Sequence, residues 1–203
     1  MNAEAVKALI ARELGISRST LYWGYMALFT GKGDKGTTTA FGCNQQRISK
    51  SSELPEALGS LDELNAFLGF VKMRSAGETR ITEALRDAQE VLFIIQAEVA
   101  GANKSVGEGV VKNIENIVNA IEKEIPKLKG FSIAGGTELS ALLDVARTLA
   151  RRAERRVIAV KELGLRELTP ETLAYLNRLS SLLFALARLA NHEAGITEEN
   201  PKY

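Results

Sequence analysis

The sequence has one cysteine, Cys43, and one histidine, His192, among its 203 residues. A lone cysteine cannot form an internal disulfide, and one cysteine with one histidine is too few for a zinc site of four protein ligands. Scarce cysteine is typical of proteins that work in a reducing compartment. We therefore expect the cytoplasm as the location.

Long hydrophobic runs and an excess of charge are also missing. No stretch approaches the roughly 20 apolar residues of a membrane-spanning helix, and the N-terminal region mixes acidic with basic residues, unlike a signal or transit peptide. Lysine and arginine number 26 against 25 aspartates and glutamates, a formal net charge of +1. This balance argues against broad electrostatic binding of nucleic acid or an acidic membrane surface, and we expect neither as a partner.

Aromatic residues make up only 6% of the chain, whereas 45% of it is hydrophobic and 25% is charged. Long stretches rich in alanine, leucine, glutamate, arginine and lysine are typical of a helical globular protein. The length suits one domain, which we place at residues 27–203. Residues 1–26 are a separate N-terminal extension with a short amphipathic helix, either a mis-assigned start upstream of Met26 or an appendage similar to a helix-turn-helix.

A DNA-binding regulator is an alternative that rests on residues 17–22, which read like the turn and the start of a recognition helix. Two observations weigh against it. The extension has too few residues for the third helix that such a unit needs, and the domain has no basic excess.

Apolar spacings and capping signals predict five core helices. Ser60 with Glu63 is a capping box that opens the first helix, to about residue 74. Apolar residues from Ile81 to Val99, at spacings of three and four, mark the second. Residues 112–125 form the third, which ends before a proline.

The last two helices have clear caps. Thr137 can cap the fourth, which ends at Gly164, and Thr169 with a following proline begins the fifth, which runs to about His192. Five helices with short connections indicate an all-α fold, an antiparallel five-helix bundle. Residues 28–59, rich in glycine and threonine, show no helical period and are predicted to be an ordered loop. Loops of this length inside compact domains are usually functional.

Residues 147–156 contain five arginines and one glutamate. At about 100° per residue, one helix face carries Arg147, Arg151, Glu154 and Arg155. The opposite face is apolar: Leu142, Ala146, Leu149, Ala150, Ala153, Val157 and Val160. A guanidinium group meets phosphate oxygens two at a time and stays charged at any working pH, so a polyanion is a natural ligand. A solvated basic face tied by salt bridges to acidic neighbours is the alternative.

The predicted loop contains the motif Gly31-Lys32-Gly33-Asp34-Lys35-Gly36. It matches the G-x-G-x-x-G spacing of dinucleotide-binding folds, but those need a strand before the motif and a helix directly after it, and here a threonine run follows. The spacing of a Walker A motif is absent as well. Glycines still let backbone amides approach an anion, and lysines and threonines add charge and donors. The motif is therefore either a phosphate cradle that acts with the arginine face or an ordinary glycine and threonine loop.

Five segments occur in a specific order: LFTGKGDKGTT at residues 28–38, LDELN at 61–65, FSIAGG at 131–136, the arginine-rich stretch at 145–155 and YLNRLS at 175–180. Together they closely resemble the PduO-type ATP:cob(I)alamin adenosyltransferases, over about residue 26 to the C-terminal region. The resemblance implies a five-helix bundle that assembles as a homotrimer, with ATP and cobalamin bound where subunits meet. It also implies transfer of the 5′-deoxyadenosyl group of ATP to the cobalt of reduced cob(I)alamin, with release of triphosphate.

The resemblance assigns roles by position. The ATP site falls on Thr30, Gly31, Lys32, Gly33, Thr38, Thr39, Lys50, Arg151, Arg152, Glu154, Arg155 and Asn177. Asp62 and Arg147 match a pair that forms a salt bridge between subunits. Phe131 matches the aromatic residue that covers the lower face of the corrin, for which plain core packing is the alternative. Arg151, Arg155 and Phe131 are the residues expected to act in catalysis.

No protein metal site is implied, because Mg²⁺ is held mainly by the ATP phosphates. Besides the substrates, the implied partners are a flavin-type reductase and an adenosylcobalamin-dependent mutase that receives the product. Ala134, Ser181 and Leu58 stand where the family commonly has proline, aspartate and an aromatic residue, which bears on the corrin-facing loop rather than on the phosphate site. An ATP-sensing or corrinoid-carrier protein on the same bundle is the alternative function.

Overall fold

The computed structural model describes residues 31–39, 46–127 and 130–202. The N-terminal extension with its helix-turn-helix candidate, Thr30 and Cys43 lie outside the described residues. The chain divides into two compact units, Met1–Thr37 and Thr38–Tyr203.

In the first unit, residues 31–36 form two consecutive turns. The Asp34 amide donates to the Gly31 carbonyl (3.2 Å), and the Gly36 amide donates to the Gly33 carbonyl (3.1 Å). Gly31 and Gly36 have φ angles of 66° and 72°, in the left-handed region that residues with a Cβ rarely adopt. The turns therefore require glycine at these two positions.

Two strands of three residues, β1 (Thr37–Thr39) and β2 (Arg47–Ser49), pair in a small sheet. The prediction of a loop over residues 28–59 is wrong in this respect. Three residues are too few to show the alternation of apolar and polar side chains by which a strand is recognised in a sequence. Because β1 follows Gly36 where a dinucleotide-binding fold would begin a helix, the structure also agrees with the rejection of that fold.

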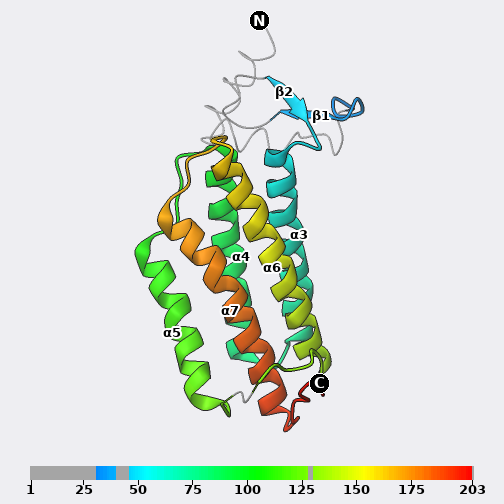
Figure 1. Cartoon of the computed structure of the whole chain (residues 1–203), viewed down its shortest axis with the longest axis vertical. Coiled ribbons are helices and arrows are strands. Elements are labelled where there is room, and N and C mark those ends of the chain that lie inside the picture. Colours follow the sequence, from blue (N-terminus) through cyan, green and yellow to red (C-terminus); the bar gives the residue numbers. More distant parts are fainter. Residues whose placement is uncertain (1–30, 40–45, 128–129, 203) are drawn as a thin grey trace, which may run out of the picture. The chain divides into compact units, whose positions relative to one another are not determined.

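The described part of the second unit contains five helices: α3 (Glu53–Arg74), α4 (Thr79–Ala100), α5 (Glu108–Glu124), α6 (Glu138–Glu162) and α7 (Pro170–Glu193). Consecutive helices run in opposite directions along the bundle (Figure 1). Helix α6 packs against α3 and α7, α4 packs against α3, and α5 packs against α7. The predicted all-α five-helix bundle is confirmed.

Two helices begin earlier than predicted. Helix α3 begins at Glu53, so the capping box at Ser60 lies inside the helix and caps nothing. Pro55 is tolerated because it lies in the first turn, where the missing amide hydrogen would have no helical acceptor. Helix α5 begins at Glu108 rather than at Lys112, and these two side chains form an ion pair of 2.8 Å across the added turn.

The predicted caps of α6 and α7 are confirmed. Thr137 Oγ1 accepts a hydrogen bond from the Ser140 amide (3.0 Å) at the start of α6. Thr169 is the cap of α7, and its amide donates to Glu98 Oε1 of α4 (2.7 Å). The buried Glu98 also accepts from the Thr172 hydroxyl. Its carboxylate thus occupies the positive end of the α7 dipole and ties two helices together.

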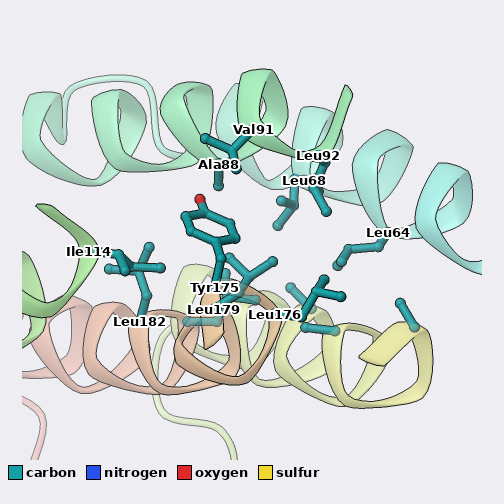
Figure 2. Packing of buried hydrophobic residues seen from close by; sticks show 14 of the residues in the cluster. Leu64, Leu68, Ala88, Val91, Leu92, Ile114, Tyr175, Leu176, Leu179 and Leu182 are labelled. Atoms are coloured by element: carbon teal, nitrogen blue, oxygen red, sulfur yellow. The ribbon is translucent and has the colours of Figure 1, made fainter. Parts of the chain in front are cut away.

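The core lies between the helices and consists mainly of leucine, isoleucine, valine and alanine. Figure 2 shows side chains from α3, α4 and α7 in this core together with Tyr175: Leu64, Leu68, Ala88, Val91, Leu92, Leu176 and Leu179. Each fully buried leucine contributes about 1.5–3 kcal/mol relative to exposure to water. Burial, with a smaller contribution from the charge of Asp87, raises the pKa of the Tyr175 phenol well above its ordinary value, so the phenol stays neutral in the core.

Gly136, directly before the α6 cap, yields a prediction about stability. Its φ is 98°, and a Cβ added there would lie 2.4 Å from Asn191 Oδ1. We expect Gly136→Ala to lower the free energy of unfolding by roughly 2–3 kcal/mol, from backbone strain and the displaced amide. Gly135→Ala is the matched control, because Gly135 has φ of 131° but no atom within 4 Å of the added Cβ. Urea denaturation measures both, and an equal loss for the two variants would contradict the proposed clash.

Candidate functional site

The arginine face of α6 points away from the core, as predicted. The opposite face is buried, with Ala146, Ala150, Ala153, Val157 and Val160 fully inaccessible to solvent and Leu142 and Leu149 partly buried. Arg151 and Arg155 are exposed, whereas Glu154 is half-buried. The apolar stripe therefore fixes the rotation of α6 and, with it, the direction in which the guanidinium groups project.

The five arginines of residues 147–156 do not share one environment. Arg152 forms an ion pair with Glu63, and Arg156 with Glu56 (3.7 Å), so both are joined to α3. Within the residues that the structure describes, neither Arg151 nor Arg155 has an ion-pair or hydrogen-bond partner. Arg147 lies 3.5 Å from Asp144. The alternative of a face tied by salt bridges thus describes three of the five arginines, while the donors of Arg151 and Arg155 are available to a ligand.

Helix α7 brings Asn177 to this face. Asn177 Nδ2 donates to Glu154 Oε1 (3.1 Å), and Arg178 Nη1 donates to Asn177 Oδ1 (3.4 Å). Arg178 is in turn paired with Glu115 of α5 (3.1 Å). Two residues assigned to the ATP site from the sequence, Glu154 and Asn177, are therefore in direct contact, and a chain of hydrogen bonds sets their orientation.

A cavity of about 1220 Å³ lies between α5, α6 and α7. Its lining combines cations with apolar side chains: Arg147, Arg151, Arg188, Lys123 and Lys127 with Val118, Ile125, Pro126, Phe184 and Ala185, together with Asn119, Glu122, Ser180 and Ser181. This volume exceeds that of most small-molecule sites, so the cavity suits a large ligand with both apolar and anionic parts. Arg151 belongs both to this large cavity and to the arginine face.

Phe131 lies in the loop of residues 130–136 between α5 and α6, called the Phe131 loop below. Its side chain is 78% exposed, so the alternative of plain core packing is wrong. The ring is not among the side chains that line the large cavity. An exposed aromatic ring at the end of a bundle is available to cover an apolar ligand.

Asp62 and Arg147 are not paired within one chain. Asp62 is exposed on α3 and borders a shallow pocket beside Phe93 of α4, which is 65% exposed. Arg147 lines the large cavity, and its Nε lies 3.5 Å from Asp144 Oδ1. In the described part of the chain no ion pair joins Asp62 to Arg147.

The remaining predicted ATP residues lie near the start of the chain. Gly31, Lys32 and Gly33 belong to the turns of the first unit, and Thr38 and Thr39 belong to β1. Lys50 is exposed in the turn that follows β2.

One group of polar residues was missed by the sequence analysis. Arg188 and Asp144 are 3% and 5% exposed and form an ion pair of 2.7 Å. The helical period gives no signal for them, because at about 100° per residue Asp144 lies on the same face as Arg151, and Arg188 lies on the face of α7 opposite Leu179. Charges on such faces are ordinarily exposed, and only the packing of the structure shows that these two are buried together.

Across residues 31–39, 46–127 and 130–202, no group of three or more His, Cys, Asp or Glu side chains could hold a metal ion. Over the same ranges, none of the helices has the length and apolar character that crossing a bilayer demands.

Comparison with known proteins identifies the family. The family model for cobalamin adenosyltransferase matches residues 28–190. A corrinoid adenosyltransferase of Bacillus subtilis is 37% identical over 178 residues, which cover 84% of this chain and 90% of the relative. The corrinoid adenosyltransferase PduO of Citrobacter freundii is 36% identical over 83% of this chain, which spans only 51% of that relative.

The fold is also that of a solved relative. A variant of a PduO-type ATP:corrinoid adenosyltransferase from Lactobacillus reuteri, complexed with cobalamin and ATP, superposes with a TM-score of 0.80 at 29% identity. The superposition covers 87% of this chain and 100% of the relative. The resemblance seen in the five sequence segments is confirmed, and a bundle with this arginine face and these relatives belongs to the cobalamin adenosyltransferase family.

Proposed function

We propose that this protein is an ATP:cob(I)alamin adenosyltransferase, which transfers the 5′-deoxyadenosyl group of ATP to the cobalt of cob(I)alamin and releases triphosphate. Family membership supports this activity. The observation that carries it in the structure is the position of Arg151, whose donors have no partner among the described residues. It borders the large cavity while it projects from the arginine face, and in our proposal this one guanidinium serves the sites of both substrates.

The reaction needs no protein nucleophile. Cobalt(I) attacks the 5′ carbon of the ribose, a cobalt–carbon bond forms, and the bond from that carbon to the triphosphate oxygen breaks with its electron pair leaving on the triphosphate. No proton has to move. The work of the protein is therefore to position the substrates and to stabilise the charge that develops on the leaving group.

Arg151 and Arg155 are the groups proposed to meet that charge. In our proposal the same phosphates are also held by Thr30, Gly31, Lys32, Gly33, Thr38, Thr39 and Lys50. Mg²⁺ bound to the phosphate oxygens would neutralise part of the charge. Arg152 is already paired with Glu63. We therefore propose that Arg152 shapes the ATP site, whereas Arg151 and Arg155 make the main contacts with the phosphates.

Glu154 is proposed to position the nucleotide rather than to act as a general base. Its carboxylate accepts a hydrogen bond from Asn177 (3.1 Å) and retains acceptor capacity for a ribose hydroxyl or a metal-bound water. Since the reaction removes no proton, a base has no task in it.

The large cavity is proposed as the site of the corrinoid. Its apolar lining suits the macrocycle, and its lysines and arginines suit the acidic phosphate of the cobalamin side chain. Phe131 does not line this cavity within one chain. In the proposed homotrimer, where the substrates bind between subunits, it is proposed to cover the lower axial face of cobalt, where an apolar ring excludes water and the base of the cobalamin tail. Cobalt(II) without an axial ligand is easier to reduce to cobalt(I).

The active assembly is proposed to be a homotrimer held in part by a salt bridge from Asp62 of one chain to Arg147 of the next. The exposed Phe93 beside Asp62 supports an interface at this place. Asp62→Arg should shift the protein toward monomer in sedimentation velocity at low micromolar concentration, because it places two cations in contact. The double variant Asp62→Arg/Arg147→Asp should restore the trimer. A trimer that survives the single charge reversal unchanged would rule out the pair.

Reduction of cobalt(II) requires an electron donor, for which we propose a flavin-type reductase, and an adenosylcobalamin-dependent mutase is the proposed recipient of the product. The single cysteine supports the cytoplasm as the location. The catalytic domain is proposed to occupy residues 27–203, which the family match from residue 28 supports.

A further inference from the structure

Hydrogen bonds join the C-terminal tail, residues 196–202, to the Phe131 loop. Three hydrogen bonds join them: Ser132 Oγ donates to Glu198 Oε2 (2.8 Å), the Ile133 amide donates to the Glu199 carbonyl (2.8 Å), and Asn200 Nδ2 donates to the Phe131 carbonyl (2.7 Å). Three consecutive loop residues are thus held by three consecutive tail residues. Such a register leaves the loop backbone little freedom.

A buried guanidinium anchors this contact to the bundle. Arg188 of α7 is 3% exposed, and its Nη1 donates to Ser132 Oγ (2.7 Å). Its Nη2 donates to Asp144 Oδ2 of α6 (2.7 Å), and its Nε lies 2.9 Å from Glu198 Oε1. One side chain therefore joins two helices, the Phe131 loop and the tail. Breaking one partner of a buried ion pair leaves the other charge uncompensated, so the arrangement resists partial opening.

The hydrogen bonds between the tail and the Phe131 loop matter because the ring of Phe131 is exposed. A ring that is 78% exposed is not held by packing, so the backbone that carries it must be fixed by other contacts. Those contacts are the hydrogen bonds to the tail. Glu198 has the central place among them, because its two oxygens contact Ser132, Arg188 and Asn191 Nδ2 (3.1 Å).

We propose that Glu198, held by the buried Arg188, is a positioning residue for adenosyl transfer: it fixes the Phe131 loop so that the exposed ring meets the corrin. The inference rests on the role proposed for Phe131. Glu198 touches no substrate in this account and acts only through the loop. Its loss should therefore reproduce the effect of losing Phe131 and should add nothing to it.

The test compares Glu198→Ala with Glu199→Ala. Both remove one carboxylate from neighbouring tail positions, but the Glu199 side chain is exposed and contacts the loop only through its main-chain carbonyl. Glu198→Ala is expected to lower turnover from cob(II)alamin roughly tenfold or more, with smaller loss when cob(I)alamin is supplied already reduced. Hydrogen exchange of residues 130–136 should accelerate in Glu198→Ala alone. ATP affinity and the trimer should be unchanged in both variants.

The double variant Phe131→Ala/Glu198→Ala completes a cycle that separates the two claims. If Glu198 acts through Phe131, the double variant is no slower than Phe131→Ala alone. Equal turnover and equal exchange for Glu198→Ala and Glu199→Ala would overturn the inference, whereas an impaired Phe131→Ala would still support the role proposed for Phe131. Full turnover in Phe131→Ala would overturn both that role and the inference, but not the transfer reaction itself. Losses that multiply in the double variant would also overturn the inference, because Glu198 would then act by another route.

Discussion

Arg151→Ala is expected to bind ATP roughly 30- to 700-fold more weakly than the unaltered protein, a loss of about 2–4 kcal/mol. The guanidinium of Arg151 has no partner among the described residues, so its donors are available to the triphosphate without breaking an existing ion pair. Removing it leaves phosphate oxygens without their donors in the bound state. Isothermal titration with ATP and Mg²⁺ measures the change directly.

The matched control for this prediction is Arg156→Ala, on the same helix. Arg156 is paired with Glu56 of α3, and such exposed pairs contribute about 0–1 kcal/mol. Because Arg156 is engaged with Glu56 and not with ATP in this account, its loss should alter ATP affinity by less than about threefold. Arg151→Lys should fall between the two, because lysine keeps the charge but not the planar fork of donors. An Arg151→Ala protein that binds ATP with unchanged affinity would remove this residue from the site.

Phe131→Ala is expected to keep the trimer and ATP binding but to lose most of its activity when cobalt(II) must be reduced on the enzyme, roughly 10- to 100-fold. Without the ring, water or the base of the cobalamin tail can reach the lower axial position and stabilise cobalt(II). The folded protein should be little affected, since a side chain that is 78% exposed contributes little to the core.

Two comparisons make the role of Phe131 specific. Phe131→Leu keeps much of the apolar bulk and should retain more activity than Phe131→Ala. Turnover should also be measured with cob(I)alamin generated beforehand by a chemical reductant, where the loss should shrink because the step that the ring assists has been bypassed. Unchanged turnover from cob(II)alamin in Phe131→Ala would exclude this role.

Local signals in the sequence were sufficient for most of the bundle. Thr137 and Thr169 are caps because their side chains or amides satisfy the first turn of a helix, and that chemistry is local. The predicted start of α3 was wrong because a proline such as Pro55 indicates the end of a helix unless it is known to lie in the first turn. The strands β1 and β2 were not predicted, because pairing between separated segments produces little signal in the sequence of either segment.

The arginine face was predicted from helical spacing. Which arginines of residues 147–156 form ion pairs could not be predicted. Arg152 is paired with Glu63, which lies 89 positions away in the sequence, and no local pattern reveals that contact. The same holds for the tail that binds the Phe131 loop, since Ser132 and Glu198 are 66 positions apart. The buried pair of Arg188 and Asp144 could not be predicted either, because the helical period places both residues on faces opposite the apolar stripes of their helices.

The most direct test of the account is a spectrophotometric assay in which cob(I)alamin, kept reduced by a chemical reductant, is mixed with the protein and with ATP and Mg²⁺. We predict that the cobalt(I) absorbance disappears only when protein and ATP are both present, with one adenosylcobalamin and one triphosphate formed per ATP consumed. A protein that binds ATP while the cobalt(I) absorbance persists and no triphosphate appears would instead be a nucleotide sensor or a corrinoid carrier, and the proposed transfer would be contradicted.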